Sequence, residues 1–205
     1  MGQVFRRAEQ YLAQFDPDYI GQFVEIGTSR QGDDGSTATI ASWARRFDKC
    51  LWTVDMDPKN CEFARALNLP NLEVVNSTGE DYAELFPSHI TYISFLYLDN
   101  FDWDWHPEKT EHFVLEQQQR YQELGFEMNN VNSQRAHLAQ MSKLIDAMGE
   151  KSLVVCDDTW YHPNEGVFIG KCSAVIPYLF LNGYKLLHSE GYRQNSGAIL
   201  GRFKQ

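Results

Sequence analysis

The strongest constraint on the fold of this chain is a repeated alternation of short apolar segments with helical stretches. In the first half of the 205-residue sequence, expected strands and expected helices follow one another in strict turn. This order is typical of a parallel sheet whose strands are joined by crossover helices. The expected strands span 23–26, 51–54 and 72–75, and the expected helices span 36–47, 58–67 and 79–86.

The second half continues this pattern and then changes it. Segments 92–98 and 153–156 are continuously apolar, as expected for strands that are covered on both faces. The turn-rich segment 191–197 separates two closing strands. We therefore predict an α/β fold, with a Rossmann-like, doubly wound, mostly parallel sheet and an antiparallel C-terminal edge. The remaining helices are expected at 4–15, 111–124, 133–148 and 173–181, with a polar linker at 127–130, and the closing strands at 184–187 and 198–203.

Length and composition favour one ordinary globular domain. We expect a single domain over 1–205, with an N-terminal helix within 1–20 and a helical insert or lid within 106–150. No apolar run approaches the roughly 20 residues that cross a bilayer, and the N-terminus lacks a signal-peptide core. The four cysteines form no CxxC pair and are expected to be reduced thiols. These features predict a cytoplasmic protein with no membrane partner.

The charge balance bears on the partners of the protein. The formal net charge is −10, and no basic stripe interrupts the acidic background. A negative surface repels phosphate backbones, so we expect no nucleic-acid partner. A small-molecule partner is expected instead, and a homodimer is left open. Lys171 and Arg193 are expected to be solvated at helix edges, with contact to an anionic substrate as the alternative.

Polar and glycine-rich segments follow the first three expected strands. In an open α/β sheet, ligands bind beyond the carboxyl ends of the strands, where loops and helix N-termini present free backbone amides. The first loop, 27–35, contains glycines that permit a close backbone approach to a ligand. Asp55 ends the second strand, where a carboxylate can accept both hydroxyls of a ribose, and Met56 beside it can pack on an adenine face. The sequence therefore favours a nucleoside cofactor, and the missing GxGxxG makes a nicotinamide cofactor the weaker alternative.

These segments resemble class I S-adenosylmethionine-dependent methyltransferases with a VEIGT-type first loop and a VDxDP second-strand end. The resemblance covers 23–104 and 153–158, about half of the chain. It implies that Glu25 and Gly27 flank the methionine portion of the cofactor and that Asp55 holds the ribose. The first loop departs from the usual compact glycine run by a longer insert, so the resemblance assigns no contacts to 28–34. The predicted cofactor-binding residues are Glu25, Gly27, Gly35, Ser36, Asp55, Met56, Ser77, Thr78, Gly79 and Asp99.

Three carboxylates are expected to meet where the fourth and fifth strands end. Asp99 follows the fourth strand, and Asp157 and Asp158 follow the fifth. Like charges at one place need protonation, hydrogen bonds or a cation, and oxygen ligands suit Mg²⁺ or Ca²⁺. The arrangement resembles metal-dependent O-methyltransferases that act on sugar and natural-product hydroxyls, which implies a metal site at these three residues. The alternative is that Asp99 and Asp157 cap turns and that Asp158 is a solvated acid.

The same region supplies the candidates for acid–base chemistry. The resembling enzymes carry a second acid two residues after the first, but this sequence has Phe101 there and Asp102 next to it. Asp102 or His106 is therefore predicted to take a proton from the acceptor hydroxyl. The predicted function is S-adenosylmethionine-dependent methyl transfer to a small-molecule hydroxyl, assisted by Mg²⁺. The alternatives are a cofactor-binding scaffold without catalysis and a nicotinamide-dependent oxidoreductase.

Overall fold

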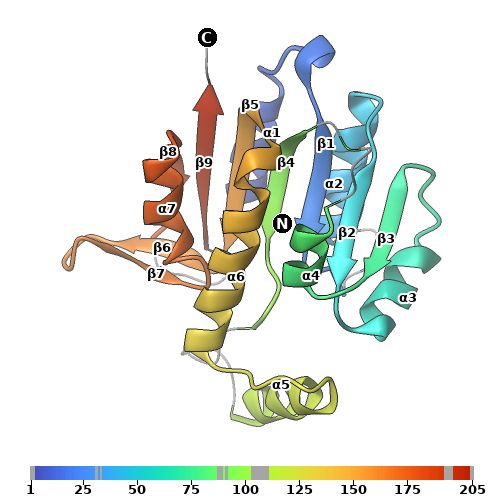
Figure 1. The fold of residues 1–205 in the computed structure, drawn as a ribbon, viewed down its shortest axis with the longest axis vertical. Coiled ribbons are helices and arrows are strands. Elements are labelled where there is room, and N and C mark those ends of the chain that lie inside the picture. Colours follow the sequence, from blue (N-terminus) through green and yellow to red (C-terminus); the bar gives the residue numbers. More distant parts are fainter. Residues whose placement is uncertain are drawn as a thin grey trace.

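The computed structural model contains a seven-stranded sheet that is flanked by helices on both faces (Figure 1). It describes residues 3–30, 32, 34–86, 90, 92–102, 111–191 and 196–203. The strand order is β3-β2-β1-β4-β5-β9-β8, so the chain runs outward from β1 to one edge and then crosses back to the other. The sheet strands are β1 (Gln22–Ile26), β2 (Leu51–Asp55), β3 (Leu72–Asn76), β4 (Ile93–Leu98), β5 (Met148–Asp157), β8 (Lys185–Ser189) and β9 (Gly197–Phe203).

The first five strands run parallel to one another, and among the seven strands of this sheet β9 is the one that runs in the opposite direction. β1 pairs in parallel with β2 and β4, while β9 pairs antiparallel with β5 and β8. The predicted mostly parallel sheet with an antiparallel C-terminal edge is confirmed. Because the order reverses between β1 and β4, their carboxyl ends leave room for a ligand at the same edge of the sheet.

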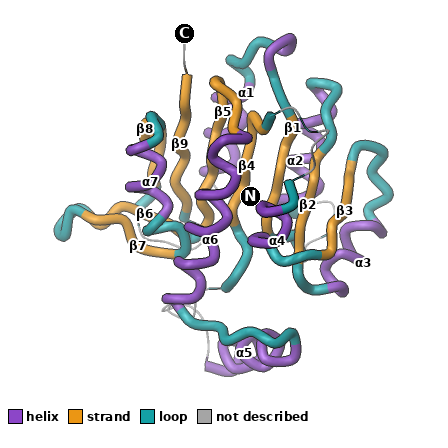
Figure 2. The backbone as a smooth tube through the Cα atoms, in the orientation of Figure 1, coloured by secondary structure: helices purple, strands orange, loops and turns teal. Residues whose placement is uncertain are grey.

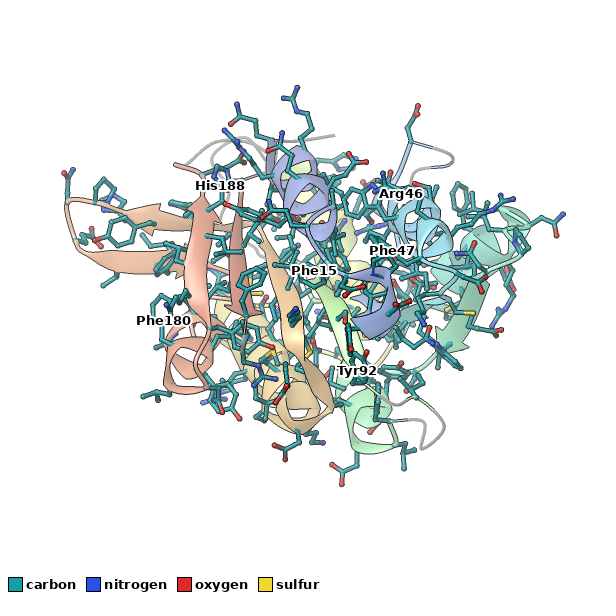
Figure 3. All side chains as sticks on the ribbon, turned by 90° about the horizontal axis from the view of Figure 1, so that it is seen from above. Phe15, Arg46, Phe47, Tyr92, Phe180 and His188 are labelled. Carbon is teal, nitrogen blue, oxygen red and sulfur yellow. The ribbon has the colours of Figure 1, made fainter. Side chains whose placement is uncertain are left out.

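Two separate apolar layers hold the helices to the sheet. One face packs against α1 (Gln3–Leu12) and α2 (Ser36–Arg46), where Phe23 and Phe95 stack with ring centroids 5.5 Å apart. The other face packs against α4 (Gly79–Glu84), α6 (Asn130–Leu144) and α7 (Val175–Leu181). Figures 2 and 3 show these two helix layers from two directions, with α3 (Pro58–Ala66) at the β3 edge. A short 3-10 helix, Pro17–Tyr19, follows α1.

Several boundaries differ from the predicted ones for local reasons. The segment 127–130 was expected to be a linker, but Asn129 accepts a hydrogen bond from the Asn132 amide and caps α6, which therefore begins earlier. α6 ends at Leu144, a 3-10 turn follows at Ile145–Ala147, and β5 begins already at Met148. The described part of the expected helical insert contains two helices: α6 belongs to the main layers, and α5 (Glu111–Glu123) lies across the carboxyl edge of the sheet.

A β-hairpin after β5 was not predicted. β6 (Thr159–His162) and β7 (Val167–Gly170) form a separate two-stranded sheet. The Gly166 amide donates to the His162 carbonyl, and Gly166 has a φ of 70°, which a glycine adopts without strain. The asparagine and glycine between two β-branched and aromatic segments were the sequence signal for this turn.

The four cysteines were expected to be reduced thiols. Cys50, Cys61, Cys156 and Cys172 are all free thiols. Within the described residues, no helix combines the length and apolarity that a membrane span requires.

Candidate functional site

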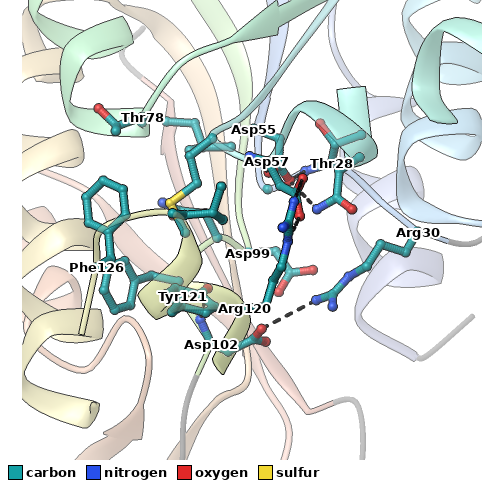
Figure 4. Close-up of a pocket in the computed structure, with 18 of the residues that line it drawn as sticks. Thr28, Arg30, Asp55, Asp57, Thr78, Asp99, Asp102, Arg120, Tyr121 and Phe126 are labelled. Carbon is teal, nitrogen blue, oxygen red and sulfur yellow. Dashed lines mark hydrogen bonds and ion pairs between the residues drawn. The ribbon is translucent and has the colours of Figure 1, made fainter. Parts of the chain in front are cut away.

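A cavity of about 640 Å³ opens where β1, β2 and β4 end, beneath α5 (Figure 4). Cofactor sites commonly occupy about 300–1,000 Å³, so the cavity has the size of a nucleoside-containing ligand. Both apolar and acidic side chains line it. Of the predicted cofactor and acid–base residues, Gly27, Asp55, Met56, Thr78, Gly79, Asp99 and Asp102 line the cavity, whereas Glu25, Gly35, Ser36 and Ser77 do not.

Gly27 shapes the floor of the cavity. Its φ is 104°, and its amide donates to the Val54 carbonyl at 2.8 Å. A Cβ atom at Gly27 would lie 2.5 Å from the Asn100 nitrogen and 2.6 Å from the Asp99 oxygen. Only glycine combines this backbone conformation with so close an approach between the ends of β1 and β4.

Asp55 faces the turn that begins at Gly27. Its Oδ2 accepts hydrogen bonds from the Thr28 amide at 3.0 Å and from the Asn60 side chain at 3.1 Å. Its Oδ1 accepts from the Asp57 amide at 2.7 Å. Burial raises the pKa of Asp55, while the hydrogen bonds from Asp57, Asn60 and Thr28 act in the opposite direction. The carboxylate is therefore held at one orientation on the cavity wall.

Glu25 lies below the loop and not on the cavity wall. The buried carboxylate accepts hydrogen bonds from the hydroxyls of Ser36 at 2.5 Å, Thr37 at 2.7 Å and Thr53 at 2.7 Å. Burial raises the pKa of Glu25 to about 7, against the effect of these hydroxyls. Since Ser36 and Thr37 open α2, Glu25 fixes the start of that helix against β1 and β2.

The end of β3 supplies another side of the cavity. Thr78 accepts a hydrogen bond from the Asp81 amide and caps α4, so the loop enters the helix at the cavity wall. A Cβ atom at Gly79 would lie 2.5 Å from the Ile26 side chain and 2.6 Å from the side-chain nitrogen of Gln140. Met56 packs on a small apolar cluster that includes Phe101.

Two arginines that the sequence did not single out connect the cavity walls. Arg120 on α5 donates through Nε to Asp57 Oδ2 at 2.7 Å and through Nη2 to Asp57 Oδ1 at 2.5 Å. Arg30 in the first loop lies 3.4 Å from Asp102. Figure 4 shows both pairs crossing the cavity. The sequence does not reveal that these two residues are partners, because Asp57 and Arg120 are 63 residues apart.

Asp102 lies where β4 leads toward α5. Its amide donates to the Tyr121 hydroxyl at 2.6 Å, and Tyr121 is buried. Tyr121, Phe101, Met128 and Ala136 form a small apolar cluster of their own, separate from the two main layers. The contacts that join α5 to the rest of the molecule include this cluster and the Arg120–Asp57 ion pair. His106, the other predicted proton acceptor, and Arg193 lie outside the described residues.

The predicted metal residues meet a lysine and not an open site. Lys171 is 2% exposed, although it was expected to be solvated. Its Nζ lies 2.7 Å from Asp99 Oδ1 and 3.2 Å from Asp158 Oδ2. Burial lowers the pKa of Lys171, but the charges of Asp99, Asp158 and Asp157 outweigh it and raise the pKa well above the usual value. Burial, together with the charges of Asp99 and Asp158, raises the pKa of Asp157 well above its usual range.

This arrangement does not fit a divalent cation as the residues stand. The described residues hold no group of three or more histidine, cysteine, aspartate or glutamate side chains placed to bind a metal ion. The positive charge that compensates Asp99 and Asp158 belongs to a side chain of the protein. The predicted magnesium site is therefore not supported.

Comparisons with known proteins agree with the fold. No protein-family model matches the sequence, and a comparison with curated proteins finds no match. Among solved structures, a putative methyltransferase from Streptococcus mutans in complex with SAH aligns over 99% of both chains, at 9% identity and a TM-score of 0.58. The chain therefore shares its Rossmann-like fold with this protein.

Two further methyltransferase structures are similar to this chain, and their names describe different kinds of methyltransferase. The O-methyltransferase NovP aligns over 98% of this chain and 79% of its own, at 11% identity and a TM-score of 0.60. An rRNA methylase from Streptococcus thermophilus aligns over 100% of this chain and 99% of its own, at 10% identity and a TM-score of 0.56. Since these identities are low, the likeness concerns the fold alone and determines neither an activity nor a substrate class for this chain.

Proposed function

We propose that this protein is an S-adenosylmethionine-dependent methyltransferase that acts on the hydroxyl of a small molecule resembling a sugar or a natural product. The observation that carries the proposal is the meeting of Asp55 with the Gly27 turn on one wall of a cavity of nucleoside size. This is the geometry that a ribose-binding carboxylate and a close backbone approach require.

The residues around the cavity fit the cofactor. Asp55 would accept hydrogen bonds from the ribose hydroxyls, and Thr78 and Gly79 would lie near adenine at the start of α4. Gly27 allows the backbone of β4 to approach the end of β1 closely, and Asp99 beside it would lie near the methionine portion. Bound S-adenosylmethionine supplies an electrophilic methyl group. Glu25 would act at a distance, since it holds the loop and α2 in place through three hydroxyls.

Asp102 is the candidate to accept the proton of the acceptor. It lines the cavity and lies 3.4 Å from Arg30, which would orient its carboxylate toward a proton on the acceptor. α5 covers this part of the cavity with Phe113 and Tyr121, which suits a compact acceptor with an apolar face. Asp157 and Asp158 do not line the cavity, and Lys171 supplies a positive charge beside Asp99 and Asp158.

A nucleic-acid acceptor is the second candidate, because structural neighbours include proteins named as rRNA methylases. The net charge of −10 and the acidic side chains around the cavity favour the small molecule. A scaffold without catalysis, or a nicotinamide-dependent oxidoreductase, would also use such a cavity, and measurements of binding and turnover distinguish both from a methyltransferase.

Calorimetric titration with S-adenosylmethionine, S-adenosylhomocysteine and NAD separates these functions. Binding of both adenosyl compounds and not NAD supports a methyltransferase site, and binding of NAD alone contradicts it. Release of S-adenosylhomocysteine is then measured with a panel of hydroxylated small molecules and with RNA. Turnover with the small molecules supports the proposal, turnover with RNA supports the second candidate, and cofactor binding without turnover on either panel supports the scaffold.

A further inference from the structure

The β6–β7 hairpin returns the chain to the point where β5 ends. Asp158 precedes the hairpin and Lys171 follows it, and the Lys171 amide donates to the Asp158 carbonyl at 3.2 Å. Gly170 has a φ of 113°, and a Cβ atom there would collide with the Asp158 carbonyl. The hairpin therefore closes tightly enough to bring the Lys171 side chain back over the carboxyl ends of β4 and β5.

The Lys171 side chain ends among the three carboxylates of this edge. Its ammonium lies 2.7 Å from Asp99 and 3.2 Å from Asp158, and only 3% of the side chain is exposed. Asp157 contributes a third acidic group, and the Asp99 carboxylate also accepts a hydrogen bond from the Tyr97 hydroxyl at 3.3 Å. An ammonium has three donors, which suits neighbouring carboxylate oxygens.

We propose that Lys171 is a built-in cation that takes the place of a divalent metal ion at Asp99, Asp157 and Asp158. Lys171 is a positioning residue, because it does not line the cavity, whereas its partner Asp99 does. It holds one oxygen of Asp99 while Tyr97 holds the other, so the carboxylate keeps one orientation at the cavity wall. The cation replacement stands on this geometry alone, and only the consequence for cofactor binding rests on the proposed function.

A metal ion and the Lys171 ammonium exclude each other at this position. Mg²⁺ requires oxygen ligands at about 2.0–2.1 Å on all sides, and a lysine cannot serve as one while it is charged. Two cations side by side in a buried site would also repel each other. Removal of the lysine leaves these carboxylates without their cation, and we expect them to rearrange around a metal ion.

Manganese binding tests the replacement without any need for substrate. Mn²⁺ is titrated into the full chain and free ion is followed by electron paramagnetic resonance. We expect the Lys171→Ala variant to bind one Mn²⁺ ion at least about tenfold more tightly than the wild type, and the added change Asp157→Asn to remove this gain. The outcome that overturns the proposal is a wild-type Mn²⁺ site that Asp157→Asn abolishes, or a folded Lys171→Ala variant with no gain.

Two variants serve as controls. Lys185→Ala removes an exposed lysine of β8 and is expected to leave Mn²⁺ binding as in the wild type. Lys171→Arg keeps the charge and is expected to bind no Mn²⁺, because the guanidinium still occupies the cluster. Circular dichroism establishes that each variant is folded. If Lys171→Ala does not fold, Mn²⁺ binding by the wild type and by Lys171→Arg still tests the proposal. Mn²⁺ bound at Asp157 in either protein contradicts the replacement of a metal ion by Lys171.

Binding of S-adenosylhomocysteine tests the positioning role. We expect the wild-type affinity to be the same in EDTA and in excess Mg²⁺. Lys171→Met, which keeps the length of the side chain and removes its charge, should weaken binding by about tenfold, and Lys171→Arg should restore most of it. Equal affinities for Lys171→Met and the wild type overturn the positioning role. Absence of binding by the wild type contradicts the proposed function and leaves the manganese result to decide on the cation.

Discussion

The Thr28 amide donates a hydrogen bond of 3.0 Å to the Asp55 carboxylate, which joins the loop after β1 to the end of β2. The same carboxylate lines the cavity, so it both closes the loop and faces the space for a ligand. A single side chain thereby sets the distance between the two segments that a nucleoside would contact.

Replacing Asp55 should weaken cofactor binding strongly. Hydrogen bonds to charged groups contribute about 1.5–3 kcal/mol, so Asp55→Ala should lower the affinity for S-adenosylhomocysteine by roughly 10–100-fold. Calorimetric titration of the folded variant measures this change. Glu73→Ala, at an exposed position of β3, is the matched control and should bind as the wild type does. An unchanged affinity in Asp55→Ala would remove the ribose role of this residue.

Gly27 should tolerate no side chain. Gly27→Ala places a Cβ atom against the Asn100 nitrogen and forces a positive φ on alanine, so it should lower the free energy of unfolding by about 2–4 kcal/mol. Gly183 also has a positive φ, of 80°, but no atom lies within 4 Å of its would-be Cβ. Gly183→Ala should therefore cost only about 1 kcal/mol. Urea unfolding of both variants checks the difference, and equal losses would mean that the contact at Gly27 is unimportant.

The pair of Arg120 and Asp57 should hold α5 over the cavity. Arg120→Met removes both hydrogen bonds to Asp57, and the amides of 111–123 should then exchange hydrogen several-fold faster. The hydrogen bond from Arg120 lowers the pKa of Asp57, so the pair should persist at any pH above the ordinary aspartate range. Hydrogen exchange followed by mass spectrometry measures this effect, with Arg45→Met on α2 as the control. Unchanged exchange in α5 would show that the apolar cluster alone holds it.

Glu25 should make stability depend on pH. Its pKa is about 7 in the folded protein and near 4.5 when unfolded, so the folded state binds the proton more tightly. The stability that Glu25 contributes is therefore complete below pH 4.5 and is lost as the pH rises through 7, by about 3 kcal/mol. We expect the unfolding free energy of the wild type to fall by that amount relative to that of Glu25→Gln from pH 4.5 to 8. A difference that is constant with pH would place an unshifted carboxylate at this position.

Local sequence patterns determined most of the fold. The alternation of apolar strands with helices predicted the parallel sheet because each strand needs a crossover helix to reach its parallel neighbour. The same reasoning located Gly27, Asp55, Thr78 and Asp99 at one edge, since the carboxyl ends of parallel strands meet there. These residues do line a common cavity. The location of these residues at one edge could be predicted because strand direction and burial alone determine it.

Contacts between distant segments were decided only by the tertiary structure. Lys171 was expected in solvent, because nothing in Gly170-Lys171-Cys172 indicates that a hairpin carries the lysine back to Asp99, 72 residues earlier. Glu25 was expected at the cofactor, but Ser36, Thr37 and Thr53 surround it from two other segments and bury it. A sequence specifies which charges exist, whereas their partners depend on how the chain folds back in three dimensions. For this protein, the sequence therefore determined the sheet and the edge at which the cavity lies, and the packing of the hairpin and α5 decided which charges meet there.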